Sequence, residues 1–182
     1  MKTIIFLSGL AVPKFFAKTK LVWNDPMWEG FNRVYYTSKV PISDNMVIDE
    51  IDNLCQLVNS YDDPFVVGQS LGAWWGGSLA CLPECKMNKL AMWTPVANAS
   101  AYPIFNVTAL HNPRNKKVNE RFLGYKNSLL CYAENDFITP NYSQSLDFLI
   151  HFKPTTFKLN GGHLLQKNHQ DGLLFMKNWF NQ

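Results

Sequence analysis

The chain has 182 residues, a length that suits one domain with a full hydrophobic core. Hydrophobic residues make up 47% of it and aromatic residues 14%, a composition that excludes an intrinsically disordered protein. The net charge is only +3, and the chain lacks the Lys and Arg blocks of nucleic-acid-binding proteins. No apolar run approaches the ~18 residues that a membrane span requires. We therefore expect no nucleic-acid partner and no membrane span.

Six short apolar runs alternate with segments of helical periodicity. The first run could pass for a short signal peptide, but Pro13 interrupts the apolar stretch, so we interpret the run as a strand. The predicted strands are Thr3–Leu7, Arg33–Tyr36, Phe65–Gly68, Lys89–Trp93, Ser128–Ala133 and Thr155–Leu159. The predicted helices are Met46–Asn59, Leu71–Cys81, Tyr142–Phe152 and His169–Phe180. This alternation predicts an α/β fold, with a mostly parallel sheet of about six strands and helices on both faces.

The segment Gly68-Gln69-Ser70-Leu71-Gly72 stands between the third predicted strand and a predicted helix. Gly-x-Ser-x-Gly occurs often by chance, but a strand before it and a helix after it are typical of a nucleophile elbow. A serine on so sharp a turn has a strained backbone, and the residues two positions away crowd against it. Glycine at both positions relieves the crowding because it lacks a Cβ. We predict that Ser70 is a catalytic nucleophile.

An acid and a histidine follow the last two predicted strands. Asp136 lies just past the fifth strand, and His163 follows the sixth after a pair of glycines. Ligands of parallel sheets bind at the carboxyl ends of the strands, so we expect Ser70, Asp136 and His163 to converge there. Glu134 is an alternative acid, two residues before Asp136. The chain order Ser, Asp, His is that of α/β-hydrolases and differs from the orders of chymotrypsin and subtilisin.

Three motifs together resemble those of small α/β-hydrolases: residues 68–72, Asp136-Phe137-Ile138-Thr139-Pro140 and Gly162-His163. The first strand and its loop Ser8-Gly9-Leu10 fit as well, although many members have His-Gly where this chain has Ser8-Gly9. The likeness spans residues 3–180. Within this superfamily the chain resembles the short members with almost no lid, such as retinoblastoma-binding-protein-9-type serine hydrolases and the compact carboxylesterases of biotin synthesis.

The resemblance implies one α/β-hydrolase domain over residues 1–182, and it favours Asp136 over Glu134 as the acid. In this fold His163 would act as the base, and Asp136 would orient it. Backbone N–H groups of Leu10 and Leu71 would form the oxyanion hole. Such an enzyme needs no cofactor and no metal.

Substrate contacts are predicted for Gly9, Gln69 and Trp74. For Trp74, packing against neighbouring helices is an equal alternative, and for Trp75 packing is the preferred interpretation. His151 and His169 lie on predicted helices and are interpreted as surface or packing residues.

Residues 95–127 are not explained by the sheet and form a predicted short cap. Five basic residues oppose one acid there: Arg114, Lys116, Lys117, Arg121 and Lys126 against Glu120. A charge run of this kind is usually a solvated surface. The alternative is a docking surface for an acidic partner such as an acyl-carrier protein. His111 lies in the same segment, where a surface role is favoured over a substrate contact.

Four cysteines lack metal-ligand spacing and are interpreted as the reduced thiols of a cytoplasmic protein: Cys55, Cys81, Cys85 and Cys131. We expect Cys55 and Cys131 to be buried. Taken together, the sequence predicts a serine esterase acting on a small-molecule ester. The alternatives are an esterase or thioesterase for acyl groups bound to a carrier, and a non-catalytic binding protein of the same fold.

Overall fold

The computed structural model describes residues 1–9, 26–37, 39, 44–80, 82–95, 127–136, 153–163 and 167–182. The predicted cap at 95–127 lies almost wholly outside these residues. So do the predicted helix Tyr142–Phe152, Leu10, Cys81, His111 and His151.

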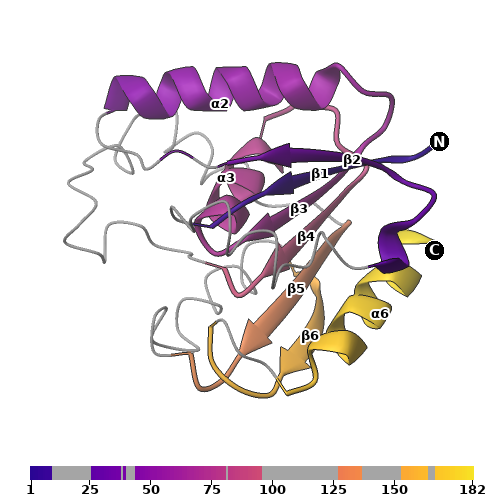
Figure 1. Ribbon diagram of the computed structural model, residues 1–182. Helices are drawn as coiled ribbons and strands as arrows, with labels where there is room; N and C mark the ends of the chain where they lie inside the picture. Colours follow the sequence, from indigo (N-terminus) through magenta and orange to yellow (C-terminus); the bar gives the residue numbers. More distant parts are fainter. Residues whose placement is uncertain are drawn as a thin grey trace.

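Six parallel strands form one sheet in the order β2-β1-β3-β4-β5-β6 (Figure 1). Their bounds are β1 Thr3–Leu7, β2 Asn32–Tyr36, β3 Phe65–Gln69, β4 Lys89–Trp93, β5 Ser128–Ala133 and β6 Thr155–Leu159. The predicted α/β class and parallel sheet are confirmed, and the strand limits differ from the prediction by one residue in β2 and one in β3. Every residue of β1 and β3 is buried, which explains why these central strands are nearly continuous apolar runs.

Helices cover both faces of the sheet, as expected. The helices α2 (Asp44–Asn59) and α3 (Leu71–Ala80) pack on one face, and α6 (His169–Phe180) packs on the other (Figure 1). The fully buried Trp28, which ends the short 3-10 helix η2 (Pro26–Trp28), belongs to the α6 face. There Phe65 of β3 stacks on Phe180 of α6 with ring centroids 4.6 Å apart. Aromatic packing of this kind ties the end of the chain to the middle of the sheet.

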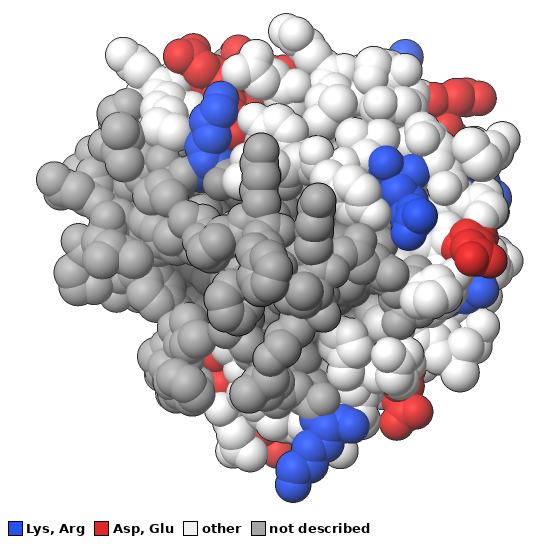
Figure 2. Space-filling model, viewed as in Figure 1, with Lys and Arg blue, Asp and Glu red and all other residues white. Residues whose placement is uncertain are grey.

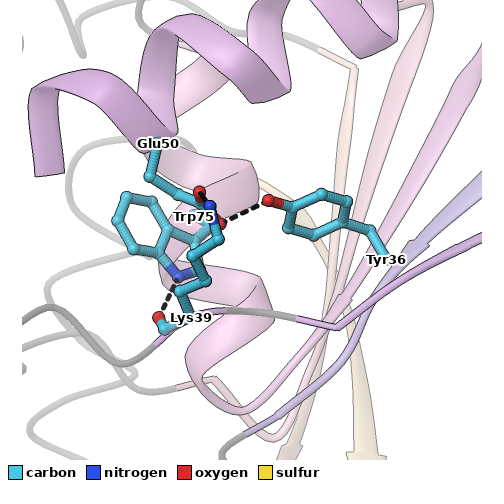
Figure 3. A network of polar contacts seen from close by, with 4 residues as sticks. All are labelled: Tyr36, Lys39, Glu50 and Trp75. Carbon is cyan, nitrogen blue, oxygen red and sulfur yellow. Dashed lines mark hydrogen bonds and ion pairs between the residues drawn. The ribbon is translucent and has the colours of Figure 1, made fainter. Parts of the chain in front are cut away.

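A buried carboxylate joins α2 to the end of β2 (Figure 3). Glu50 is 1% exposed, and its Oε1 accepts a 2.6 Å hydrogen bond from the Tyr36 hydroxyl. The Lys39 ammonium lies 2.8 Å from Oε2 and pairs with it by charge. The indole N–H of Trp75 donates to the Lys39 carbonyl at 3.3 Å, so α3 joins the same network. Burial and the bond to Glu50 raise the pKa of Tyr36, which therefore remains a hydrogen-bond donor.

This network also reaches the first loop of the sheet, because the Tyr36 carbonyl accepts the N–H of Ser8 at 3.0 Å. Removing a partner of the buried Glu50 carboxylate would leave its charge poorly compensated away from water, so the network fixes the end of β2 against both helices. The loop that begins at Ser8 is thus held from the β2 side.

Cys55, Cys85 and Cys131 are buried free thiols, as the sequence predicts for two of them. Burial raises the pKa of each, which makes them poor nucleophiles at neutral pH. The Lys and Arg side chains of the described surface stand apart from one another on the face in Figure 2. Among the described helices, none is both long and apolar enough to cross a membrane.

Candidate active site

The predicted catalytic residues lie at the carboxyl ends of three strands. Ser70 follows β3 directly, Asp136 comes shortly after β5, and His163 follows β6. All strands run in the same direction, so these ends share one edge of the sheet.

Ser70 occupies a sharp turn between β3 and α3. Its φ of +53° lies in the left-handed region, which a residue with a Cβ enters only under strain. The turn is held from both sides, since Ser70 N–H donates to the Trp93 carbonyl and Ala73 N–H donates to the Ser70 carbonyl, each at 3.0 Å. The neighbouring strand β4 therefore helps to maintain the strained conformation.

Glycine at 72 is required by a close approach of backbone. A Cβ there would overlap the Leu7 carbonyl and lie 2.6 Å from the backbone carbonyl oxygen of Ser8. Glycine is also required at 68, because a Cβ added there would lie 2.5 Å from the Cα of Ala73. The end of β1 can approach the elbow this closely only because residue 72 has no Cβ, and the first turn of α3 can lie against residue 68 only because that residue has none.

The side chains of Ser70, His163 and Asp136 form one hydrogen-bonded chain. His163 Nε2 lies 2.9 Å from Ser70 Oγ, and His163 Nδ1 lies 2.6 Å from Asp136 Oδ2. A carboxylate can only accept, so the proton of a neutral imidazole belongs on Nδ1, and Nε2 is left to accept from the serine hydroxyl. The exposed fractions are 9% for Ser70, 3% for His163 and 7% for Asp136, so little water competes for these bonds.

Glu134, the alternative acid, is placed elsewhere. Its carboxylate forms an ion pair with Lys158 at 2.6 Å, and both side chains are about half exposed. The hydrogen bond that Lys158 donates to the Glu134 carboxylate raises the pKa of Lys158. Asp136, and not Glu134, contacts the histidine.

This difference predicts unequal effects of two conservative substitutions. Asp136→Asn should lower kcat by about 10⁴-fold, because an amide can favour the wrong tautomer of the imidazole. Glu134→Gln removes only an exposed ion pair and should leave kcat within about twofold, since such pairs contribute little. Steady-state kinetics on the two folded variants tests the assignment, and a larger loss in Glu134→Gln would reverse it.

Backbone N–H groups near Ser70 provide candidate oxyanion donors. Leu71 is the first residue of α3, where N–H groups have no acceptor within the helix and the helix dipole is positive. Gly9 lies against the elbow, because a Cβ at this position would be 3.1 Å from Ser70 Cβ and 3.6 Å from Ser70 Oγ. The first loop therefore adjoins the nucleophile, and the donor predicted at Leu10 lies outside the described residues.

The predicted substrate contacts have differing surroundings. Gln69 is 9% exposed, and its Oε1 has no hydrogen-bond partner among the described residues. Trp74 is 6% exposed and packs in the core, with its ring 4.6 Å from that of Trp75. Contacts of Gly9, Gln69 and Trp74 with substrate remain predictions.

Thr94 was not singled out by the sequence. It follows β4 beside the elbow, has a φ of +41°, and is 1% exposed. Its hydroxyl has no partner within the described part of the chain. A β-branched residue in this region is an outlier that only tertiary structure reveals.

His169 stands at the start of α6 with its ring centroid 5.4 Å from that of Trp93, which agrees with a packing role. In the described ranges, no three His, Cys, Asp or Glu side chains are grouped to hold a metal ion.

Comparisons with known proteins find likeness at the level of structure. No family model and no curated protein matches the chain. A hydrolase of the α/β superfamily from Xanthomonas campestris has a TM-score of 0.62 at 11% identity, and the match covers 100% of this chain and 99% of that one. For the fluorophosphonate-binding serine hydrolase F of Staphylococcus aureus the TM-score is 0.65 at 16% identity, with 98% and 84% covered. The thioesterase domain of the curacin biosynthetic pathway has a TM-score of 0.64 at 12% identity, with 100% and 91% covered.

Each match extends over nearly the whole of this chain, so the likeness concerns the complete sheet and its helices. The predicted likeness to retinoblastoma-binding-protein-9-type hydrolases and to biotin-pathway esterases is not tested by these structures and stays a prediction.

Proposed function

We propose that this chain, which has the α/β-hydrolase fold, is a serine hydrolase that cleaves carboxylic esters through an acyl-enzyme. The observation that carries the proposal is the hydrogen-bonded chain from Ser70 through His163 to Asp136. A non-catalytic binding protein of the same fold would have no need to keep all three groups aligned and buried around a strained serine.

In the first half-reaction Ser70 Oγ attacks the ester carbonyl carbon while His163 Nε2 accepts the hydroxyl proton. The carbonyl oxygen becomes an oxyanion, which the N–H of Leu71 and a donor of the first loop stabilise. His163 then gives its proton to the alcohol oxygen as the C–O bond breaks, and Ser70 is left acylated.

In the second half-reaction a water molecule replaces the alcohol. His163 accepts a proton from the water, whose oxygen attacks the acyl carbon, and then returns the proton to Ser70 Oγ as the acid leaves. Asp136 keeps the imidazole in the required tautomer and stabilises the imidazolium in both steps. The loss of one oxyanion donor in comparable sites costs about 3–4 kcal/mol of transition-state stabilisation.

The test is a panel of p-nitrophenyl esters of rising acyl length, assayed with the wild-type protein. We expect turnover of short and medium acyl groups, with one acyl length preferred. Absence of turnover across the panel, together with no acyl-enzyme by mass spectrometry, would favour the non-catalytic alternative.

A second candidate is an esterase or thioesterase for acyl groups carried by an acidic protein. It is supported by the excess of basic residues at 95–127, a segment that lies almost wholly outside the described residues, and by the fold likeness to the curacin thioesterase domain. Basic residues there would attract an acidic carrier over several ångströms. Cytoplasmic localisation is part of the same proposal and is supported by the free thiols of Cys55, Cys85 and Cys131, which suit a reducing compartment.

The second candidate predicts a strong effect of salt on one kind of substrate. Turnover of a carrier-bound acyl group should fall steeply between 0.1 M and 1 M salt, as the Debye length shrinks from ~10 Å to ~3 Å. Changing Lys116 and Lys117 to Glu should raise the KM for the carrier-bound substrate. Turnover of a neutral p-nitrophenyl ester, the matched control, should respond little to either change. If salt and charge reversal affected the turnover of both substrates equally, the basic segment would be interpreted as a solvated surface.

A further inference from the structure

Asn168 occupies the N-cap position of α6 but does not cap it. Asparagine is among the residues preferred at this position, because its side-chain oxygen can accept an N–H of the first helical turn. In this structure the Asn168 side chain makes no such bond, and its φ of −104° and ψ of +34° differ from the usual cap conformation. The first turn of α6 therefore lacks a stabilising interaction that the residue could have supplied.

The Asn168 side chain instead forms hydrogen bonds with backbone groups at the start of the loop that carries His163. Asn168 Oδ1 accepts the N–H of Asn160 at 2.7 Å, and Asn168 Nδ2 donates to the Lys158 carbonyl at 3.1 Å. A third bond runs beside them, since Lys167 N–H donates to the Asn160 carbonyl at 2.8 Å. Together these bonds connect residues 158–160, where β6 ends, to residues 167–168, where α6 begins. We call this group of three hydrogen bonds the loop clamp.

The loop enclosed by the clamp needs such a constraint. His163 is preceded by Gly161, with a φ of +136°, and by Gly162, and glycine leaves the backbone more conformational freedom than any other residue. His163 must keep Nε2 within hydrogen-bond distance of Ser70 while Nδ1 stays bonded to Asp136. A displacement of about 1 Å at a reacting group can cost about 10²-fold in rate.

The clamp lies at the surface, because the two bonds of the Asn168 side chain are exposed to solvent. Exposed hydrogen bonds add little to the free energy of unfolding, since water replaces them when they break. The expected consequence of losing them is therefore a change in the geometry of the loop rather than a loss of the fold.

We propose that Asn168 is a positioning residue that holds residues 158–160 against residues 167–168, so that the His163 imidazole stays aligned between Asp136 and Ser70. The expected effect of Asn168 on turnover rests on the proposed function. Its expected effect on the position of the imidazole does not. In an ordinary structural role the Asn168 side chain would cap α6, but it makes no hydrogen bond to the first turn of that helix.

Two substitutions separate the clamp from the cap. Asn168→Ser keeps a good N-cap residue, but its short side chain cannot bridge to both Asn160 and Lys158. Asn168→Asp keeps the oxygen that accepts from Asn160 and loses the donor to Lys158, while its charge favours the start of a helix. Asn178→Ser is the matched control, since it changes an exposed asparagine near the other end of α6.

We expect kcat on a p-nitrophenyl ester to fall by about 10-fold or more in Asn168→Ser and by less in Asn168→Asp, with KM nearly unchanged. The thermal midpoint of both variants should equal or exceed that of the wild type, because each can cap α6. The control should retain wild-type kcat. A role in capping the helix alone would leave both kcat and the thermal midpoint close to the wild-type values, because serine and aspartate also cap.

A second readout does not need turnover. The His163 Nδ1 proton, bonded to Asp136, should give a far-downfield proton NMR signal, and its exchange with water should be faster in Asn168→Ser than in wild type or control. Unchanged kcat and unchanged exchange in a folded Asn168→Ser would overturn the inference. If the wild type hydrolyses no ester while the variant still exchanges faster, the clamp stands and the proposed function fails.

Discussion

Ser70→Ala should lower ester turnover by at least ~10³-fold, because the members of a triad act as a unit and no other group can form the acyl-enzyme. The fold should persist, since alanine removes only the hydroxyl from a buried side chain. The matched control is Ser78→Ala in α3, the helix that follows Ser70. Ser78 is also buried, and its hydroxyl donates to the Trp74 carbonyl at 2.9 Å, away from the triad bonds. Its loss should leave kcat within about twofold.

The prediction is tested by measuring initial rates on one p-nitrophenyl ester with both purified variants. Undiminished turnover in a folded Ser70→Ala protein would exclude Ser70 as the nucleophile. An equal loss in Ser78→Ala would assign the effect to helix packing rather than to chemistry.

Gly72→Ala should destabilise the protein by about 3 kcal/mol or more, at the upper end of what overpacking costs. The added Cβ would overlap the Leu7 carbonyl and lie 2.5 Å from the Leu7 carbonyl carbon. These are backbone atoms of the fully buried strand β1, so no side chain can turn aside to make room. Any relief must move the elbow away from the first loop, and turnover should fall as well.

Urea unfolding measures this effect, with Gly30→Ala as its control. Gly30 has a φ of +87° and open space around it, so alanine there adds left-handed strain without a clash. That strain should cost about 1 kcal/mol. If the free energy of unfolding of Gly72→Ala came within about 1 kcal/mol of that of Gly30→Ala, the close approach at the elbow would be refuted.

The sheet could be predicted because its central strands are buried on both faces. Such strands must be apolar throughout, and glycines and polar residues mark where each run ends, so the limits of β1, β4 and β5 could be predicted to the residue. The limits of β6 could be predicted as well, although this edge strand is mostly exposed. The convergence of Ser70, Asp136 and His163 follows from the same argument, since each stands just past a strand of a parallel sheet. The choice of Asp136 over Glu134 came from a resemblance, and the structure adds a physical reason in the Glu134–Lys158 pair.

Other features depend on contacts between distant segments and could not be predicted. An asparagine before a helix predicts a cap, yet the Asn168 side chain bonds to residues that β6 brings beside it. A glutamate in an amphipathic helix predicts an exposed side chain, yet Glu50 is buried because Tyr36 at the end of β2 and Lys39 just after it contact its carboxylate. The left-handed backbone of Thr94 has no local signal, because the residue is β-branched.

The central claim is that Ser70 is activated by His163, and covalent labelling with a fluorophosphonate tests it most directly. Intact-mass spectrometry of the wild-type protein should show one phosphonate added, and peptide mapping should place it on Ser70. His163→Ala should slow labelling by about 10³-fold or more, because the hydroxyl loses its base. Labelling at another residue, or none at all in the folded wild-type protein, would contradict the claim.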